Sequence, residues 1–425
     1  MPSSEHDPLL PSSNGNGIQP RKPLARRVLD VLKAEGQPSW LSSFRFFLFG
    51  SWLNILLVFV PLSATAHYAN WDAAFRFSFS FIAIMPLAAL LGTATDQLSL
   101  KLGQTLSGLL NASFGNAVEI IVGVAALMQG ELRIVQTSLL GSILSNLLLV
   151  LGCSFLAGGL KFRESNFQVT AAQASSSLMT LTCITLVIPA AYHSAKAHAG
   201  GVDPDAFRIL PFPQTTQVVD GSDLDDASGH GLKIISRGTA ILLLLVYVAY
   251  LFFQLKTHAY LYQSDVEIEE ETPRMNIPAA ATGLLTATLI TSFCADFLVA
   301  SIEETAERYH IPKPFIGLIL LPIVANAAEH VTSVWMAMKN KMELTIGICV
   351  GSSIQIAAFV VPLLVIVGWI THHDLTLFFA DFETIVLFVS VLLVNFLIQD
   401  GKSNYMEGLM LITLYLVIAL AFWVS

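Results

Sequence analysis

The sequence is a succession of apolar runs, each about 20 residues long and bounded by polar or turn-forming residues. A helix of that length crosses the hydrocarbon core of a bilayer, so each run predicts one transmembrane helix. Runs this long are typical of helices, not of the alternating strands of an outer-membrane barrel, and they predict an all-α polytopic membrane protein. The eleven predicted spans are 44–64, 73–94, 105–129, 134–157, 169–192, 235–256, 278–302, 315–338, 344–369, 378–398 and 404–424.

Composition agrees with this pattern and excludes other classes. Apolar residues make up 54% of the chain, charged residues only 12%, and the mean hydropathy is +0.66. A net charge of -9 without a basic patch gives no reason to expect nucleic-acid binding. The four cysteines fall inside predicted spans without CxxC spacing, so neither a disulfide framework nor a zinc site is expected.

The amino-terminal segment differs from the rest. Residues 1–43 are rich in Ser, Pro, Gly and Asn and contain no apolar leader, so we expect a disordered tail that is not a signal peptide. The run from Glu5 to Leu10 matches an acidic dileucine sorting signal for vacuoles or lysosomes, although such short matches also occur by chance. Basic residues between Arg21 and Lys33 place this terminus in the cytosol by the positive-inside rule.

Two polar motifs recur at one spacing. Asn116-Ala-Val-Glu119 recurs 210 residues later as Asn326-Ala-Ala-Glu329, and Gly-Ser at 141–142 recurs at 351–352. Five predicted spans separate the copies, and an odd number reverses the direction in which the chain crosses the bilayer. The sequence therefore predicts inverted repeats, which bind substrate near the membrane midplane and work by alternating access.

This repeat sets the expected organisation. A leading helix at 44–64 precedes a first five-helix half at 73–256, an acidic cytosolic linker at 257–277 and a second five-helix half at 278–424. Interruptions of the two motif helices are expected at Gly115 beside Asn116 and at Leu321-Pro322.

The repeated motif points to cation binding. A carboxylate in the bilayer is costly, so Glu119 and Glu329 must face the protein interior, water or a cation. Asn116 and Asn326 lie three residues earlier, so each pair presents an amide and a carboxylate on one helix face. Such oxygen donors suit Ca²⁺ better than the nitrogen and sulfur ligands that zinc prefers, and we predict that these four residues hold the metal.

Other intramembrane polar residues have two possible roles. They either line the ion pathway or only hydrogen-bond neighbouring helices. His330 is a candidate proton carrier or a packed imidazole, and Asp296 is a candidate pathway group. The remaining candidates are Gln136, Ser142, Ser145, Asn146, Ser352, Ser353 and Gln355.

Competition at the two carboxylates suffices for exchange. Burial favours the protonated carboxyl group and a divalent cation favours the ionised one, so each ligand displaces the other. If only loaded states change access, metal moves in exchange for H⁺ without a covalent step or cofactor.

At these motifs the sequence resembles the calcium/proton exchanger (CAX) family of the cation/calcium exchanger superfamily, most closely its fungal vacuolar members. The residues that carry the resemblance are Gly108–Glu119 and Gly317–His330, with departures at Ala325, where Gly is usual, and at Asp96-Gln97. The resemblance implies a 1 + 5 + 5 helix plan, Glu119 and Glu329 as the central ion-binding carboxylates with Asn116 and Asn326 beside them, and vacuolar Ca²⁺ accumulation driven by protons. The sequence leaves open whether Mn²⁺ is also carried.

The acidic run of the linker resembles a shortened form of that family's acidic helix. It contains Glu267, Glu269, Glu270 and Glu271, which form either a regulatory ion site or a solvated charge run.

Three rival functions are weighed against this one. A cation channel also uses rings of carboxylates, but inverted repeats around single glutamates favour a carrier. A sodium/calcium exchanger shares the repeat plan, whereas the Asn-Ala-x-Glu motifs and His330 favour protons. An intramembrane enzyme is not expected, because the sequence has no HExxH or GxSxG motif.

Overall fold

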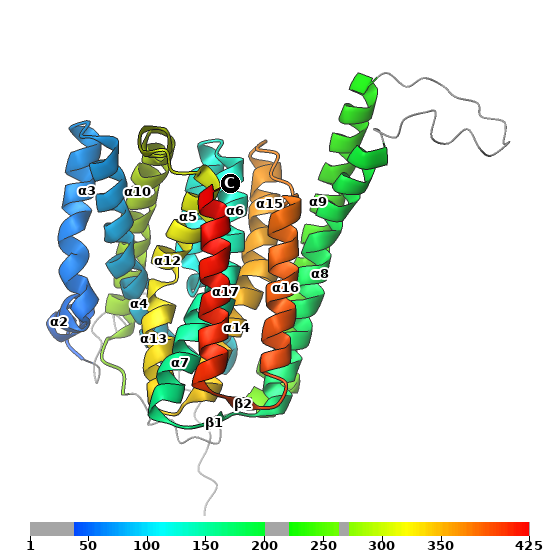
Figure 1. Cartoon of the computed structure of the whole chain (residues 1–425). Coiled ribbons are helices and arrows are strands. Elements are labelled where there is room, and N and C mark those ends of the chain that lie inside the picture. The colour runs from blue at the N-terminus through cyan, green and yellow to red at the C-terminus, as the bar shows by residue number, and fades with distance from the viewer. Residues whose placement is uncertain (1–37, 200–220, 263–271, 425) are drawn as a thin grey trace, which may run out of the picture.

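The computed structural model describes residues 38–199, 221–262 and 272–424 (Figure 1). Most of these residues are helical, and most helices run side by side along one direction, as a membrane bundle requires. Two short strands, β1 (Ser165–Asn166) and β2 (Lys402–Ser403), pair antiparallel at one end of the bundle, which we call the β face. Residues 1–37 and the acidic run Glu267, Glu269, Glu270 and Glu271 lie outside the described residues, and so does the sorting motif.

The leading helix differs from the prediction. In place of one span at 44–64, α2 (Trp40–Phe49) is followed by η1 (Trp52–Val58) and α3 (Phe59–Tyr68), with a bend of 86° between α2 and the segment that follows. The Asn54 amide explains the bend, because it donates hydrogen bonds of 3.0 Å to the carbonyls of Phe47 and Leu48 that α2 leaves unpaired at its end. The predicted tail was also four residues too long, since α2 begins at Trp40.

The next two predicted spans, 73–94 and 105–129, share a helix. α4 (Ala73–Phe114) runs through the expected loop, and α5 (Ala117–Met128) follows after a break at Gly115 and Asn116. Residues 95–104 carry no proline and several good helix formers, so nothing ends the helix there. The predicted interruption at Gly115–Asn116 is confirmed.

In the rest of the first half each predicted span has a helix, but α8 extends past the predicted end at 192 and α9 begins well before the predicted start at 235. A π turn, η2, joins α6 to α7 without a loop, as π turns often do at functional sites. The elements are α6 (Leu132–Leu144), η2 (Ser145–Val150), α7 (Leu151–Lys161), α8 (Val169–Ala199), α9 (Gly221–Phe252), η4 (Phe253–Thr257) and η5 (Ala259–Tyr262).

In the second half one predicted interruption is displaced. The helix bends by 58° at Asn326 and not at Leu321-Pro322, while Pro322, which lacks a backbone donor, follows the π turn η6. The elements are α10 (Ile277–Tyr309), α11 (Lys313–Phe315), η6 (Ile316–Leu320), α12 (Leu321–Ala325), α13 (Ala327–Met338), α14 (Met342–Gln355), η7 (Ile356–Val360), α15 (Val361–Ile370), α16 (Asp381–Leu397) and α17 (Tyr405–Val424).

By length and composition, seven helical segments in the described part of the chain could each cross a membrane, and the two bent pairs would raise the number to nine. Their burial separates centre from periphery. In the segment Leu132–Lys161 83% of the most apolar window is buried, against 17% in Gly231–Thr257, so α6 and α7 are central and α9 faces the lipid. The protein is therefore a helical, multi-pass membrane protein.

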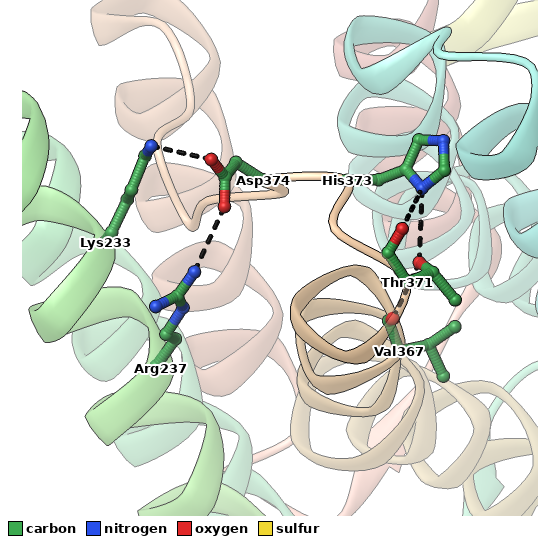
Figure 2. A network of polar contacts seen from close by, with 6 residues as sticks. All are labelled: Lys233, Arg237, Val367, Thr371, His373 and Asp374. Carbon is green, nitrogen blue, oxygen red and sulfur yellow. Dashed lines mark hydrogen bonds and ion pairs between the residues drawn. The ribbon is translucent and has the colours of Figure 1, made fainter.

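Polar contacts, drawn in Figure 2, join the two halves near the loop between α15 and α16, which lies at the end of the bundle opposite the β face (Figure 1). Lys233 and Arg237 of α9 hold the two carboxylate oxygens of Asp374 at 2.6 and 3.0 Å, and the Arg237 guanidinium lies 4.8 Å from the centre of the Trp369 ring. The Lys233 ammonium, which hydrogen-bonds Asp374, lowers the pKa of that carboxyl group. His373 does not join these ion pairs; its ring nitrogen lies 2.9 Å from the carbonyl oxygen of Thr371.

Candidate functional site

The two repeated motifs place their carboxylates at equivalent positions. Asn116 precedes α5 and Asn326 precedes α13, so Glu119 and Glu329 each lie in the first turn of a helix that begins at the break. Helix amino-termini carry partial positive charge, which stabilises an ionised carboxylate there. Asn116 hydrogen-bonds Ser352 and Gln355 of the second half, and Asn326 hydrogen-bonds the carbonyl oxygen of Ser142 in the first, so the structure brings the motifs of both halves to one site.

The site contains buried oxygen atoms that accept no hydrogen bond. They include Glu119 Oε1, Glu329 Oε2 and Asn326 Oδ1, and neither glutamate forms an ion pair with a described residue. Ser145 Oγ and Asn146 Oδ1 are also buried without a partner. A buried polar atom without a partner costs free energy, so these oxygens are poised to receive protons or a cation.

A hydrogen-bonded chain crosses between the halves at the same level. Asn146 Nδ2 donates to Ser352 Oγ at 3.0 Å, Ser352 donates to Asn116 Oδ1 at 3.0 Å, and Asn116 Nδ2 donates to Gln355 Oε1 at 2.5 Å. Asn326 Nδ2 donates to the carbonyl oxygen of Ser142 at 3.2 Å. These predicted site residues therefore hold one another in place across the two halves.

A cavity of about 560 Å³ leads to this site from the β face. Phe167 and Gln168, which directly follow β1, line its outer part, and Asn116 and Glu329 line its inner part. Its lining includes three carboxylates, those of Asp96, Glu329 and Glu343, and no Lys, Arg or His side chain. A divalent cation is therefore favoured along it.

On the other side of the site the space is almost filled. A cavity of only about 20 Å³ lies beside Glu119, lined by Ser138, Ser142 and mostly apolar side chains. Gly141 packs against the second half here, because a Cβ at this position would lie 2.2 Å from the carbonyl oxygen of Leu318. The site is thus open toward the β face and closed toward the opposite face.

Several predicted residues are not brought to the carboxylates. The Asp296 side chain is exposed and lines neither cavity. Gln136 donates instead to the carbonyl oxygen of Thr376 at 2.9 Å, and Ser353 to that of Cys349 at 2.8 Å. His330 is half-buried beside Glu329 but lines neither cavity.

The sequence reasoning missed other polar residues of the cavity. Asp96 lies just past the end of the predicted span 73–94, and Glu343 follows a polar loop. Neither residue recurs at the 210-residue spacing, since Arg133 corresponds to Glu343 and Ala306 to Asp96, so the repeat gave no signal for them. No three His, Cys, Asp or Glu side chains gather as a metal site in the described ranges, so any further ligands would be amide, hydroxyl or water oxygens.

Comparison with known proteins identifies the family of this chain. The family model described as sodium/calcium exchanger protein matches residues 73–256 and 279–424. The vacuolar calcium ion transporter of Schizosaccharomyces pombe is 46% identical over 378 residues, which are 88% of this chain and 85% of that protein. The vacuolar cation/proton exchanger 2 of Oryza sativa subsp. japonica is 40% identical over 394 residues, which are 90% of this chain and 84% of the relative.

A solved structure shares the fold. The crystal structure of the selenium-substituted Ca²⁺/H⁺ antiporter protein YfkE superimposes with a TM-score of 0.69 at 32% identity, covering 88% of this chain and 99% of that one. The match of the family model spans most of the chain and takes in both motif helices. This chain belongs to the sodium/calcium exchanger protein family, a family of transporters.

Proposed function

We propose that this protein is a Ca²⁺/H⁺ antiporter in which the metal and protons compete for Glu119 and Glu329. The observation that carries the proposal is the set of buried oxygens without donors, contributed by both halves to one site. Hard oxygen ligands suit Ca²⁺, and Mn²⁺ is a possible second substrate. The names of the relatives, which include calcium transporters, a cation/proton exchanger and a Ca²⁺/H⁺ antiporter, support the same function.

Protons are the natural counter-ions of such a site. With neither Lys nor Arg paired to them, two neighbouring buried carboxylates cannot both stay ionised without a cation. They either take up protons or bind the metal, so loading one ligand requires release of the other. His330, next to Glu329, is proposed as a proton carrier on the same helix, and Asp296 as a group on a pathway not open here.

The cavities support alternating access. Seven of the eleven residues that line the small cavity have a counterpart 210 residues away in the lining of the large one. The pairs are Asn111 and Leu321, Gly115 and Ala325, Val118 and Ala328, Glu119 and Glu329, Val122 and Thr332, Ser138 and Ile348, and Ser142 and Ser352. Equivalent positions of the two halves thus line an open route on one side of the site and a closed route on the other, as expected for inverted repeats in one access state.

We further propose the 1 + 5 + 5 plan, with the leading helix ahead of halves 73–256 and 278–424. The ranges that match the family model, 73–256 and 279–424, support this division. The seven long helices count as one span each, and so do the two bent pairs, α2 with η1–α3 and α12 with α13. Adding α5 together with the end of α4, and then α16, gives eleven spans. Positive residues before α2, which lies at the same end of the bundle as the strands (Figure 1), favour a cytosolic β face, and the vacuolar relatives favour a vacuolar membrane.

Transport into proteoliposomes tests the proposal. With an imposed pH gradient and no sodium, we expect uptake of ⁴⁵Ca²⁺ that stops when the gradient is collapsed. Glu119→Gln and Glu329→Gln should each abolish uptake, whereas the matched control Glu307→Gln, at an exposed position, should not.

Parallel vesicles with Mn²⁺ or with a sodium gradient separate the rivals. Uptake driven by sodium and insensitive to pH would move the function to sodium/calcium exchange. A flux that follows the metal gradient alone and survives both glutamine variants would indicate a channel.

A further inference from the structure

The two access routes differ chemically at positions that the repeat makes equivalent. On the open route, Thr332 and Asn111 line the cavity. On the closed route, the residues at the same register are Val122 and Leu321. One pair is reversed, with Ser138 on the closed side and Ile348 on the open side. Thr332 lies one helical turn past Glu329, directly along the route to the carboxylate.

The surroundings of these pairs deepen the difference. The residues of the small cavity without a counterpart are all apolar: Ile84, Leu139, Leu298 and Val324. The large cavity adds carboxylates, among them Glu343. Its counterpart at the same register is Arg133, which is paired to the buried Glu383 at the closed end.

The difference in lining affects transport because the cation must shed part of its hydration shell along either route. A divalent cation gives up water only where protein oxygens replace it, so a stretch lined by hydroxyl and carboxylate groups passes the ion more easily than one lined by Val and Leu. Apolar constrictions also exclude water, which helps to keep the closed route closed.

Resting on the proposed antiport, we infer that Val122 and Leu321 form an apolar barrier that makes the two sides of the carrier unequal, so that Ca²⁺ loads with a lower KM from the β face than from the opposite face. These two residues act on access and not on the ion-binding oxygens. Both residues set how easily Ca²⁺ passes along the closed route, so changing them should alter KM at the face opposite the β face only.

The test is ⁴⁵Ca²⁺/Ca²⁺ exchange at equal pH on both sides, in vesicles sorted for one orientation by capture of an amino-terminal tag. For the unmodified protein we expect KM at the β face to be lower by at least about fivefold, the effect of roughly one net hydrogen-bond contact. Val122→Thr combined with Leu321→Asn should lower KM at the opposite face only. The comparison variant Val122→Ala, which removes bulk without adding an oxygen, should leave KM at the β face unchanged and lower KM at the opposite face by less than the double variant.

The reciprocal variant Thr332→Val should raise KM at the β face only, which keeps the test decisive if the double variant does not fold. Equal KM values at the two faces of the unmodified protein would overturn the inference while leaving antiport intact. A change of KM at both faces in any of these variants would also overturn it, because it would place the residue in the ion site. Absence of any Ca²⁺ exchange in the unmodified protein would instead refute the proposed function.

Discussion

Replacing Gly351 by alanine tests whether the two halves exchange environments. In this structure a Cβ at Gly351 would meet no atom within 4 Å. At Gly141, 210 residues earlier, the same atom would lie 2.2 Å from the carbonyl oxygen of Leu318 and 2.6 Å from Pro322 Cγ. If the change of access inverts the roles of the halves, Gly351 must become packed as Gly141 is packed now.

The clash sets the expected magnitude. Ordinary van der Waals contact begins at 3.4 Å, so at 2.2 Å the chains would have to separate by the difference, 1.2 Å. Overpacking of this kind costs about 1–3 kcal/mol. Because the Gly351→Ala methyl group is tolerated in the present state and opposed in the other, it should shift the equilibrium between them by about 5- to 150-fold.

Transport and stability measured together give the assay. We expect Gly351→Ala to keep the thermal unfolding temperature of the parent protein in detergent, whereas its transport turnover should fall by about 5- to 150-fold. Gly347→Ala is the matched control, because a Cβ there also meets nothing within 4 Å and its counterpart, Thr137, already carries a side chain. Full transport by Gly351→Ala, or an equal loss in Gly347→Ala, would refute the exchange of environments.

Three shorter predictions follow from other contacts. Ser352→Ala should lower Ca²⁺ affinity and cost about 1–3 kcal/mol of stability, because it leaves the Asn146 donor and the Asn116 acceptor unpaired; Ca²⁺-dependent stabilisation in a thermal assay measures both. Gly408→Ala should destabilise the fold by at least about 1–3 kcal/mol, since its Cβ would lie 2.3 Å from the backbone nitrogen of Leu156, and thermal unfolding with Gly92→Ala as control checks this. Asp374→Asn should cost less than about 1 kcal/mol, because the ion pairs with Lys233 and Arg237 are exposed. The pKa of Asp374 is lower in the folded state, so the stability that its ion pairs contribute is present above the pKa of the unfolded state and is lost as pH falls through the pKa of the folded state. The unfolding temperatures of the variant and the parent should therefore differ equally at pH 8 and pH 5 and converge only below about pH 4.

The helical fold was predictable because lipid imposes one rule on every span. Apolar length alone located α6 with α7, α10, α14 with α15, and α17 within a few residues. The bend before η1 was not predictable in the same way. It depends on Asn54 turning back to the carbonyls of α2, a contact between side chain and backbone that hydropathy does not encode.

For the candidate site, the repeat was the informative signal. It singled out Asn116, Glu119, Asn326 and Glu329, which the structure places together at two helix starts. The repeat spacing does not tell which way a side chain points. It therefore could not separate residues that line the site from residues that only hydrogen-bond other helices or loops. Gln136, for example, is an intramembrane amide that hydrogen-bonds a loop at the closed end.

The difference between a carrier and a channel lies in how the two routes are coupled, and the contacts in this structure bear on that coupling. A channel keeps one continuous route, whereas here a wide and a nearly filled cavity use the same register of the two halves on opposite sides of one pair of carboxylates. Closure depends on close backbone contact at Gly141, and the open route leaves Gly351 uncovered. Since packed interfaces have discrete arrangements and do not deform continuously, closing one route is favoured only where the other opens. On the proposed mechanism, mutual exclusion of the routes and mutual exclusion of metal and protons at the carboxylates would together be sufficient for coupled exchange.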